Sequence, residues 1–254
     1  MISEVGKMSD FKKYLNKYEF KTVLPGTGQK LTFKPITTGQ MKALLVHEGE
    51  QEMGVIEAVL DQLMTECIVT PKNFNVENMY INDRFFFLIE LRKYTKGTTY
   101  QFEYKCPDCD SQTLQTVDLK NLNVTKLPKK INNLVELDDD ISVVLDFPKR
   151  IDQKNAYEIL RTYEGTPTES QQTAELGIIV TALTIQSVIT PDGEDKNTSI
   201  EDRIYLLENI TTEMYEKIAK WSTTNFGVDF FVEIKCKSCG HSHKVDIPPE
   251  NFFF

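Results

Sequence analysis

Four of the five cysteines form two CxxC pairs, Cys106/Cys109 and Cys236/Cys239. The two-residue gap lets both sulfur atoms of a pair point to one side of a turn. Each pair can then supply half of a tetrahedral site with Zn–S distances of about 2.3 Å. Two such pairs make a four-cysteine site of the zinc-ribbon type. The sequence therefore predicts one structural zinc ion per chain, bound by Cys106, Cys109, Cys236 and Cys239.

Other interpretations of the cysteine pairs remain open. A thioredoxin-like redox pair stands at the start of a helix, where the helix dipole lowers the thiol pKa, whereas strands are expected on both sides of these pairs. The pairs could also be free thiols. His241 and His243 could each replace a cysteine ligand, although alternating histidines on a returning strand are more typical of an exposed surface. Cys67 has no partner motif and is expected to be a small buried residue.

Each CxxC pair is predicted to form the tip of a β-hairpin. Residues 100–105 and 230–235 alternate between apolar and polar side chains, which indicates strands that lead into the pairs. Extended segments return after both pairs. Because 126 residues separate Cys109 from Cys236, the pairs do not have the spacing of a single ribbon, and a larger symmetry must bring the two tips together.

A tandem duplication would supply that symmetry. Residues 100–109 align without gaps on residues 230–239. Earlier landmarks also recur in the same order: a hairpin signal followed by proline, an apolar helix, a Thr-Pro stop, and a helix that begins Ile-x-Asp-Arg. They lie at 19–35 and 134–148, at 55–64 and 176–184, at Thr70-Pro71 and Thr190-Pro191, and at 81–84 and 200–203. We therefore expect an α+β fold that repeats a β-hairpin/helices/strand-CxxC-strand unit, with the halves joined through the zinc-ribbon-like site of four cysteines.

These landmarks divide the chain into four parts. Residues 1–18 form an N-terminal arm, residues 19–121 the first repeat, residues 131–247 the second repeat, and residues 248–254 an aromatic C-terminal tail. The second repeat is expected to contain one further helix, over residues 213–222. The two repeats are expected to pack as one compact, pseudo-symmetric domain.

The two Ile-x-Asp-Arg helix starts contain Asp83-Arg84 and Asp202-Arg203. An aspartate in the first turn complements the helix dipole. The adjacent arginine is expected to pair across the interface between the repeats. We interpret these residues as structural rather than catalytic.

The composition excludes several classes of protein. The formal net charge is −9, so the mean field repels nucleic acid and anionic membranes. A zinc-ribbon nucleic-acid-binding protein is therefore the alternative to a protein-binding role, and not the preferred interpretation. No apolar run approaches the roughly 18 residues needed to span a bilayer, and residues 1–7 do not resemble a secretory signal. We expect a protein of the reducing cytosol, without disulfides.

Motifs of the common catalytic sites are missing from the sequence. It contains no P-loop, GxGxxG, HExxH, GxSxG or EF-hand pattern. Only three histidines are present, which is a poor supply for acid–base chemistry. The sequence therefore predicts a protein that is not an enzyme and has no small-molecule substrate.

The whole pattern resembles the small baseplate hub proteins of T-even-like contractile-tailed bacteriophages. The resemblance rests on segments 31–37 (LTFKPIT), 102–109 (FEYKCPDC) and 234–240 (IKCKSCG), and on the aromatic C-terminal end. It implies a role in building the central hub of the tail baseplate, as a hub subunit or as an assembly factor. It also implies that the partners are other hub proteins, met in the host cytoplasm during assembly and in the virion tail baseplate.

The chain ends with the aromatic residues Phe252, Phe253 and Phe254. Three consecutive aromatic side chains cannot all face one side of an extended segment, and exposed apolar residues often mark partner sites. We expect these residues to anchor in a pocket of another hub protein. The alternative is that the tail folds back onto the core of its own chain.

Overall fold

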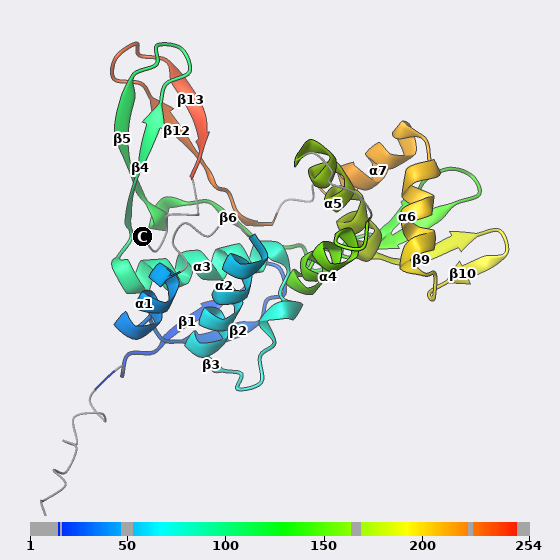
Figure 1. The fold of residues 1–254 in the computed structure, drawn as a ribbon, viewed down its shortest axis with the longest axis horizontal. Helices are drawn as coiled ribbons and strands as arrows, with labels where there is room; N and C mark the ends of the chain where they lie inside the picture. Colours follow the sequence, from blue (N-terminus) through cyan, green and yellow to red (C-terminus); the bar gives the residue numbers. More distant parts are fainter. Residues whose placement is uncertain (1–14, 16, 47–52, 164–168, 223–225, 248–254) are drawn as a thin grey trace, which may run out of the picture.

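The computed structural model describes residues 15, 17–46, 53–163, 169–222 and 226–247. In this part of the chain it shows a mixed fold of seven α-helices and several small antiparallel sheets. Figure 1 shows two bodies side by side, one with α1–α3 and both CxxC hairpins, the other with α4–α7. The buried apolar side chains also form two clusters, one in each body.

The first body is built on a three-stranded sheet with the order β1-β2-β3. Alternation in β2 turns Leu31 and Phe33 into the core, while the neighbouring side chains stay more exposed. The helices α1, α2 and α3 pack against this sheet. The strands are β1 (Phe20–Val23), β2 (Lys30–Phe33) and β3 (Ile68–Thr70), the helices are α1 (Thr38–Val46), α2 (Met53–Cys67) and α3 (Ile81–Lys96), and a short 3-10 helix spans Val76–Asn78.

Helix α3 is the central element of the first body. Seven consecutive residues, 86–92, are buried, which requires neighbours on every side of the helix. The guanidinium group of Arg92 donates to the carbonyl oxygens of Gly97 (2.7 Å) and Thr99 (3.2 Å) just beyond the helix. These bonds fix the point where the first CxxC hairpin leaves α3.

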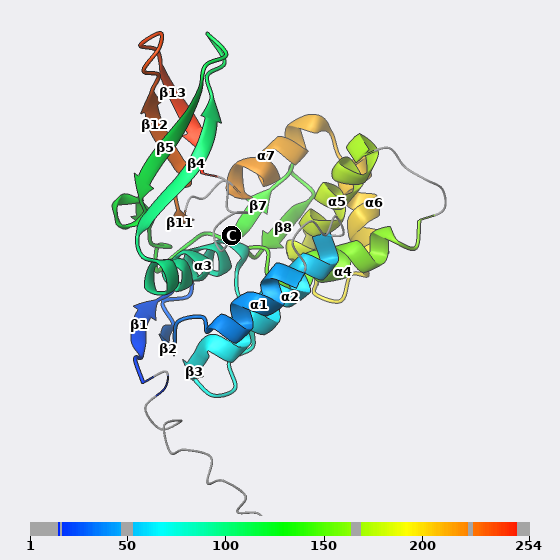
Figure 2. The same cartoon turned by 60° about the vertical axis from the view of Figure 1, so that its left-hand side comes forward.

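The two CxxC hairpins stand next to each other above α3 (Figure 2). The first pairs β4 (Thr99–Lys105) with β5 (Gln112–Asp118), and the second pairs β12 (Phe231–Lys235) with β13 (Ser242–Asp246). The buried residues of both hairpins belong to the core of the first body. A short ribbon of β6 (Val124–Thr125) and β11 (Gly227–Val228) joins their bases, after a 3-10 helix at Leu119–Asn121.

The second body has a four-stranded sheet with the order β10-β9-β8-β7. Val143, Leu145, Ala182 and Ile185 are fully buried in its core. The strands are β7 (Leu134–Glu136), β8 (Ser142–Leu145), β9 (Ile185–Thr190) and β10 (Gly193–Asp195), and the helices are α4 (Arg150–Leu160), α5 (Glu169–Thr184), α6 (Ile200–Asn209) and α7 (Thr212–Ser222).

Three strands of the second sheet repeat the order of the first sheet. Strands β7, β8 and β9 are antiparallel neighbours in chain order, as β1, β2 and β3 are. Each central strand has a register irregularity near its end, after which Phe33 pairs with Ile68 and Leu145 pairs with Ile185. The alignment of the two Thr-Pro stops makes Val188 the counterpart of Ile68. The strand pairing instead gives Ile185, which lies three residues before Val188. β9 continues beyond Ile185, and its last residues also pair with β10.

Candidate metal centre

The four predicted ligands lie together at the tips of the two hairpins. All four sulfur atoms are within 4.8 Å of one another. The Sγ–Sγ distances between hairpins are 3.7 Å for Cys106 and Cys239 and 3.7 Å for Cys109 and Cys236. A tetrahedral site with Zn–S distances of about 2.3 Å has S–S edges of about 3.8 Å. The cluster therefore has the size that a zinc site with four cysteine ligands requires.

The same backbone turn presents the sulfur atoms in both hairpins. In the first hairpin, the N–H of Cys106 donates to the carbonyl of Ser111 (3.0 Å), and the N–H of Asp110 donates to the carbonyl of Cys106 (2.9 Å). The second hairpin makes the equivalent bonds, from Cys236 to His241 (2.8 Å) and from Gly240 to Cys236 (2.9 Å). The first cysteine of each pair is buried and the second is exposed. The cluster thus closes the gap between the hairpins and lies close to the surface.

The surroundings change the acidity of the thiols in opposite directions. Hydrogen bonds from the Ser111 hydroxyl and from backbone N–H groups lower the pKa of Cys236 to about 5. The Ser111 hydroxyl also lowers the pKa of Cys109. Although the backbone N–H of His241 favours its thiolate, partial desolvation and the neighbouring sulfur atoms raise the pKa of Cys239 to about 12. A bound dication would deprotonate the remaining thiols, because it favours the thiolate strongly.

The two histidines gather around one carboxylate next to the cysteines. His241 Nδ1 lies 3.2 Å from Asp108 Oδ2, and His243 Nε2 lies 3.1 Å from the same oxygen. His243 Nε2 is also 3.5 Å from the sulfur of Cys106. These residues lie beside the four-cysteine cluster and can support it through hydrogen bonds. Two further groups have ligand atoms within 4.8 Å of one another: Cys106, Asp108 and His243, and Asp108, Cys239 and His241.

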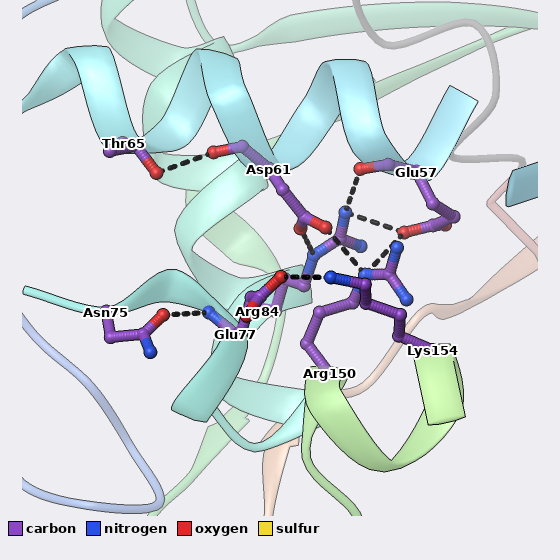
Figure 3. Close-up of polar contacts among 8 residues, drawn as sticks. All are labelled: Glu57, Asp61, Thr65, Asn75, Glu77, Arg84, Arg150 and Lys154. Carbon is purple, nitrogen blue, oxygen red and sulfur yellow. Dashed lines mark hydrogen bonds and ion pairs between the residues drawn. The ribbon is translucent and has the colours of Figure 1, made fainter. Parts of the chain in front are cut away.

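A second polar cluster links the two bodies (Figure 3). Arg84 of α3 contacts two side chains of α2, with 3.0 Å from its Nε to Asp61 Oδ1 and 2.6 Å from its Nη2 to Glu57 Oε2. Arg150, from α4 of the second body, places its Nε 2.8 Å from Asp61 Oδ2. Two buried arginines thus share the carboxylates of one helix, and nearby Lys154 pairs with Glu77 at 2.9 Å.

The expectation that the helix-start arginines pair across the repeats is wrong for Arg84. Arg84 pairs within the first body, and Arg150 makes the contact between bodies. This happens because α4 starts beside the start of α3, where the N–H of Ile81 donates to the Pro148 carbonyl (2.9 Å). The side chain of Arg150 reaches Asp61 of α2 from this position. Arg203 is half-buried, and its Nε has no hydrogen-bond partner among the described residues.

Sequence reasoning missed the residues that support both clusters. Ser111 could have been found, because it stands two residues after its CxxC pair, at the position that His241 occupies after the second pair. Glu57, Asp61 and Arg150 carried no usable signal, since charges on predicted helices are normally solvated. Cys67 is buried as expected, and burial raises its pKa to about 12.

The predicted anchor residues Phe252, Phe253 and Phe254 lie outside the described residues, as does most of the N-terminal arm. In the part of the chain that is described, no helix has the length and apolar character to cross a membrane.

Both clusters tie distant elements together, which is typical of a structural protein. Comparison with protein families shows that residues 15–254 match the family described as T4 bacteriophage base plate protein. The chain belongs to this family and is a T4-like phage baseplate protein with a structural role in the phage tail. Comparisons with curated proteins and with solved structures gave no match.

Proposed function

We propose that this protein is a non-enzymatic component of the central hub of the baseplate, acting as a hub subunit or as a hub assembly factor. The family match over residues 15–254 is the observation that carries this proposal. The partners are other hub proteins, first in the host cytoplasm and then in the baseplate. Nothing in the described residues favours nucleic-acid binding, and the net charge of −9 opposes it.

Deletion of the gene from the phage tests this role. The mutant phage should produce tails without a complete baseplate hub, while heads assemble normally. Mass spectrometry of purified wild-type virions then separates the two forms of the proposal, because a subunit stays in the particle and an assembly factor leaves it. Normal baseplates in the deletion mutant would contradict both forms.

We also propose that Cys106, Cys109, Cys236 and Cys239 hold one structural Zn²⁺. The Sγ–Sγ distances of 3.7 Å support this assignment. Four thiolates leave no open coordination position, so the ion would contribute stability and no catalysis. Because each hairpin supplies two ligands, loss of one cysteine should loosen both hairpins.

The variant Cys236→Ser tests the shared site, with Cys67→Ala as the control for loss of a buried thiol. Hydrogen exchange should become faster over both 99–118 and 231–246 in Cys236→Ser, and over neither range in Cys67→Ala. Faster exchange in the second hairpin alone would show that the hairpins do not share a metal.

We propose further that the chain arose by tandem duplication. The shared sheet order, the register irregularities near the ends of β2 and β8, and the two matching cysteine turns support this origin. Superposition of the two halves in a crystal structure tests this origin, and Asp83 should then coincide with Asp202. Helices α3 and α6 at unrelated positions would contradict it.

A further inference from the structure

An apolar pocket lies at the base of the second hairpin, where the described chain ends. It has a volume of about 360 Å³, and its apolar walls come from Phe85, Phe226, Val228, Phe230 and Ile247. We call it the aromatic pocket. Phe85, Val228 and Phe230 are only half-buried, so their side chains keep apolar surface that an occupant could cover.

The walls of the aromatic pocket are held in place by specific contacts. The rings of Phe85 and Phe230 meet edge to face, with centroids 5.6 Å apart. The side-chain amide of Asn82 donates to the carbonyl oxygen of Phe226 at 2.9 Å. Rings arranged in this way offer both faces and edges to a further aromatic ring. The pocket is therefore preformed for an aromatic side chain.

The polar side chains at the pocket argue against recognition of an anion. Asn82 and Asp246 complete the lining, and Asp246 would repel a carboxylate. An occupant must therefore be held by its apolar rings, with any acidic group directed to solvent.

The C-terminal tail starts at this pocket. The N–H of Ile247 donates to the carbonyl of Phe230 at 2.8 Å, so the point of exit is fixed at the pocket wall. Phe252 is five residues further on and can reach about 17 Å from Ile247 in extended form. The intervening Pro-Pro-Glu-Asn sequence is rich in turn-forming residues, which allows the chain to reverse.

We propose that an aromatic ring of Phe252–Phe254 occupies the aromatic pocket of its own chain. A short tether gives the tail an effective concentration in the millimolar range at this pocket. A second copy or a partner protein cannot match this concentration. The proposal favours the fold-back alternative over the expected anchor on another hub protein.

The second body offers a competing pocket, which provides a matched control. Its volume is about 350 Å³, and its apolar lining includes Ile141, Val188, Leu206 and Ile210. Tyr205 also lines it and is 67 % exposed. A tail that reached this pocket in another molecule would link two copies of the chain.

A double-mutant cycle on the full chain tests the proposal. Truncation after Asn251 should lower Tm by several degrees in the wild-type background and in Tyr205→Ala. The same truncation should change Tm by less than about one degree in Val228→Lys, because that pocket is already blocked. The shifts should not depend on protein concentration, since the contact is intramolecular.

Three results would overturn the proposal: no change of Tm on truncation, equal shifts in Val228→Lys and wild type, or a shift that grows with protein concentration. If Val228→Lys does not fold, hydrogen exchange of residues 226–231 decides instead. Exchange should be slower in the full chain than in the truncated chain, and equal rates would contradict the proposal.

Discussion

Helices α3 and α6 begin with the same pattern, Ile-x-Asp-Arg, but the two starts lie in opposite environments. Asp83 and Arg84 are 0 % and 2 % exposed. The carboxylate of Asp83 accepts hydrogen bonds from the N–H groups of Gly26 (2.6 Å) and Thr27 (3.0 Å), in the turn between β1 and β2. Asp202 is exposed, and among the described residues its carboxylate accepts a hydrogen bond only from the nearby hydroxyl of Ser199, at 2.8 Å.

The start of helix α3 is buried because another segment of the chain covers it. The ring of Phe226 lies against Gly26, and Gly227 passes so close to Asn82 that a Cβ at this glycine would lie 2.9 Å from the Asn82 Cβ. Both residues belong to the segment that leads into the second CxxC hairpin. The start of α3 is therefore buried by chain from the other half of the sequence. One motif thus has a tertiary role in the first body and a local role in the second.

The pair Arg84→Met and Arg203→Met should show the largest difference. Arg84→Met removes a buried partner of Glu57 and Asp61, and breaking a buried ion pair in this way costs about 3–5 kcal/mol. Arg203→Met should change the free energy of unfolding by less than about 1 kcal/mol. Urea denaturation followed by circular dichroism measures both. Equal losses would show that the two starts are equivalent.

Asp83→Ala and Asp202→Ala should differ in the same direction. Asp83→Ala leaves two backbone N–H groups without partners and should cost about 2–3 kcal/mol. Asp202→Ala removes a local capping interaction worth about 0.5–1 kcal/mol. The same urea titrations measure both losses, and a larger loss in Asp202→Ala would contradict the comparison.

The pH dependence sharpens this comparison. Burial raises the pKa of Asp83, so the folded state holds its proton more tightly than the unfolded state does. The contribution of this group to stability is then fully present below its ordinary pKa and is lost as the pH rises through its raised pKa. The stability difference between wild type and Asp83→Ala should therefore increase on acidification through this range. A constant difference would contradict the burial of Asp83.

The variant Gly26→Ala tests whether the segment that contains Phe226 covers the start of helix α3. A Cβ at Gly26 would lie 2.5 Å from the Phe226 ring and 2.9 Å from Asp83 Oδ1, and such overpacking costs about 1–3 kcal/mol. The control is Gly177→Ala in α5, where nothing lies within 4 Å of the new Cβ. It should stabilise the protein by about 0.5–1 kcal/mol. Thermal unfolding of both variants should give shifts of opposite sign.

The two cysteine turns should differ in the reactivity of their exposed thiols, and this comparison does not involve stability. Cys109 and Cys239 are both exposed, but the pKa of Cys109 is lowered and that of Cys239 is raised to about 12. Since the thiolate is the nucleophile, iodoacetamide at neutral pH should modify Cys109 before Cys239 in metal-free protein. Mass spectrometry of modified peptides measures the order. Faster modification of Cys239 would contradict the assigned effect of Ser111.

The sequence was sufficient to predict local features of this molecule. The hairpins, the positions of the main helices and the four-cysteine cluster follow from alternation, stop signals and CxxC spacing. The packing of β12 and β13 on the first body did not follow, because no local pattern encodes which core a hairpin joins. The role of Arg150 was missed for the same reason. Its charge resembles that of a solvated helix start until α2 is placed beside it.

Metal analysis of protein purified without chelator tests the central claim most directly, that four cysteines from the two hairpins hold one structural ion. The cluster geometry, with cross-hairpin Sγ–Sγ distances of 3.7 Å, predicts one zinc per chain in the wild type and a complete loss of stoichiometric zinc in Cys236→Ser. A zinc-free wild-type protein would contradict the claim. Two zinc ions per chain would contradict it as well, since each hairpin would then bind its own metal with ligands such as His241 or His243.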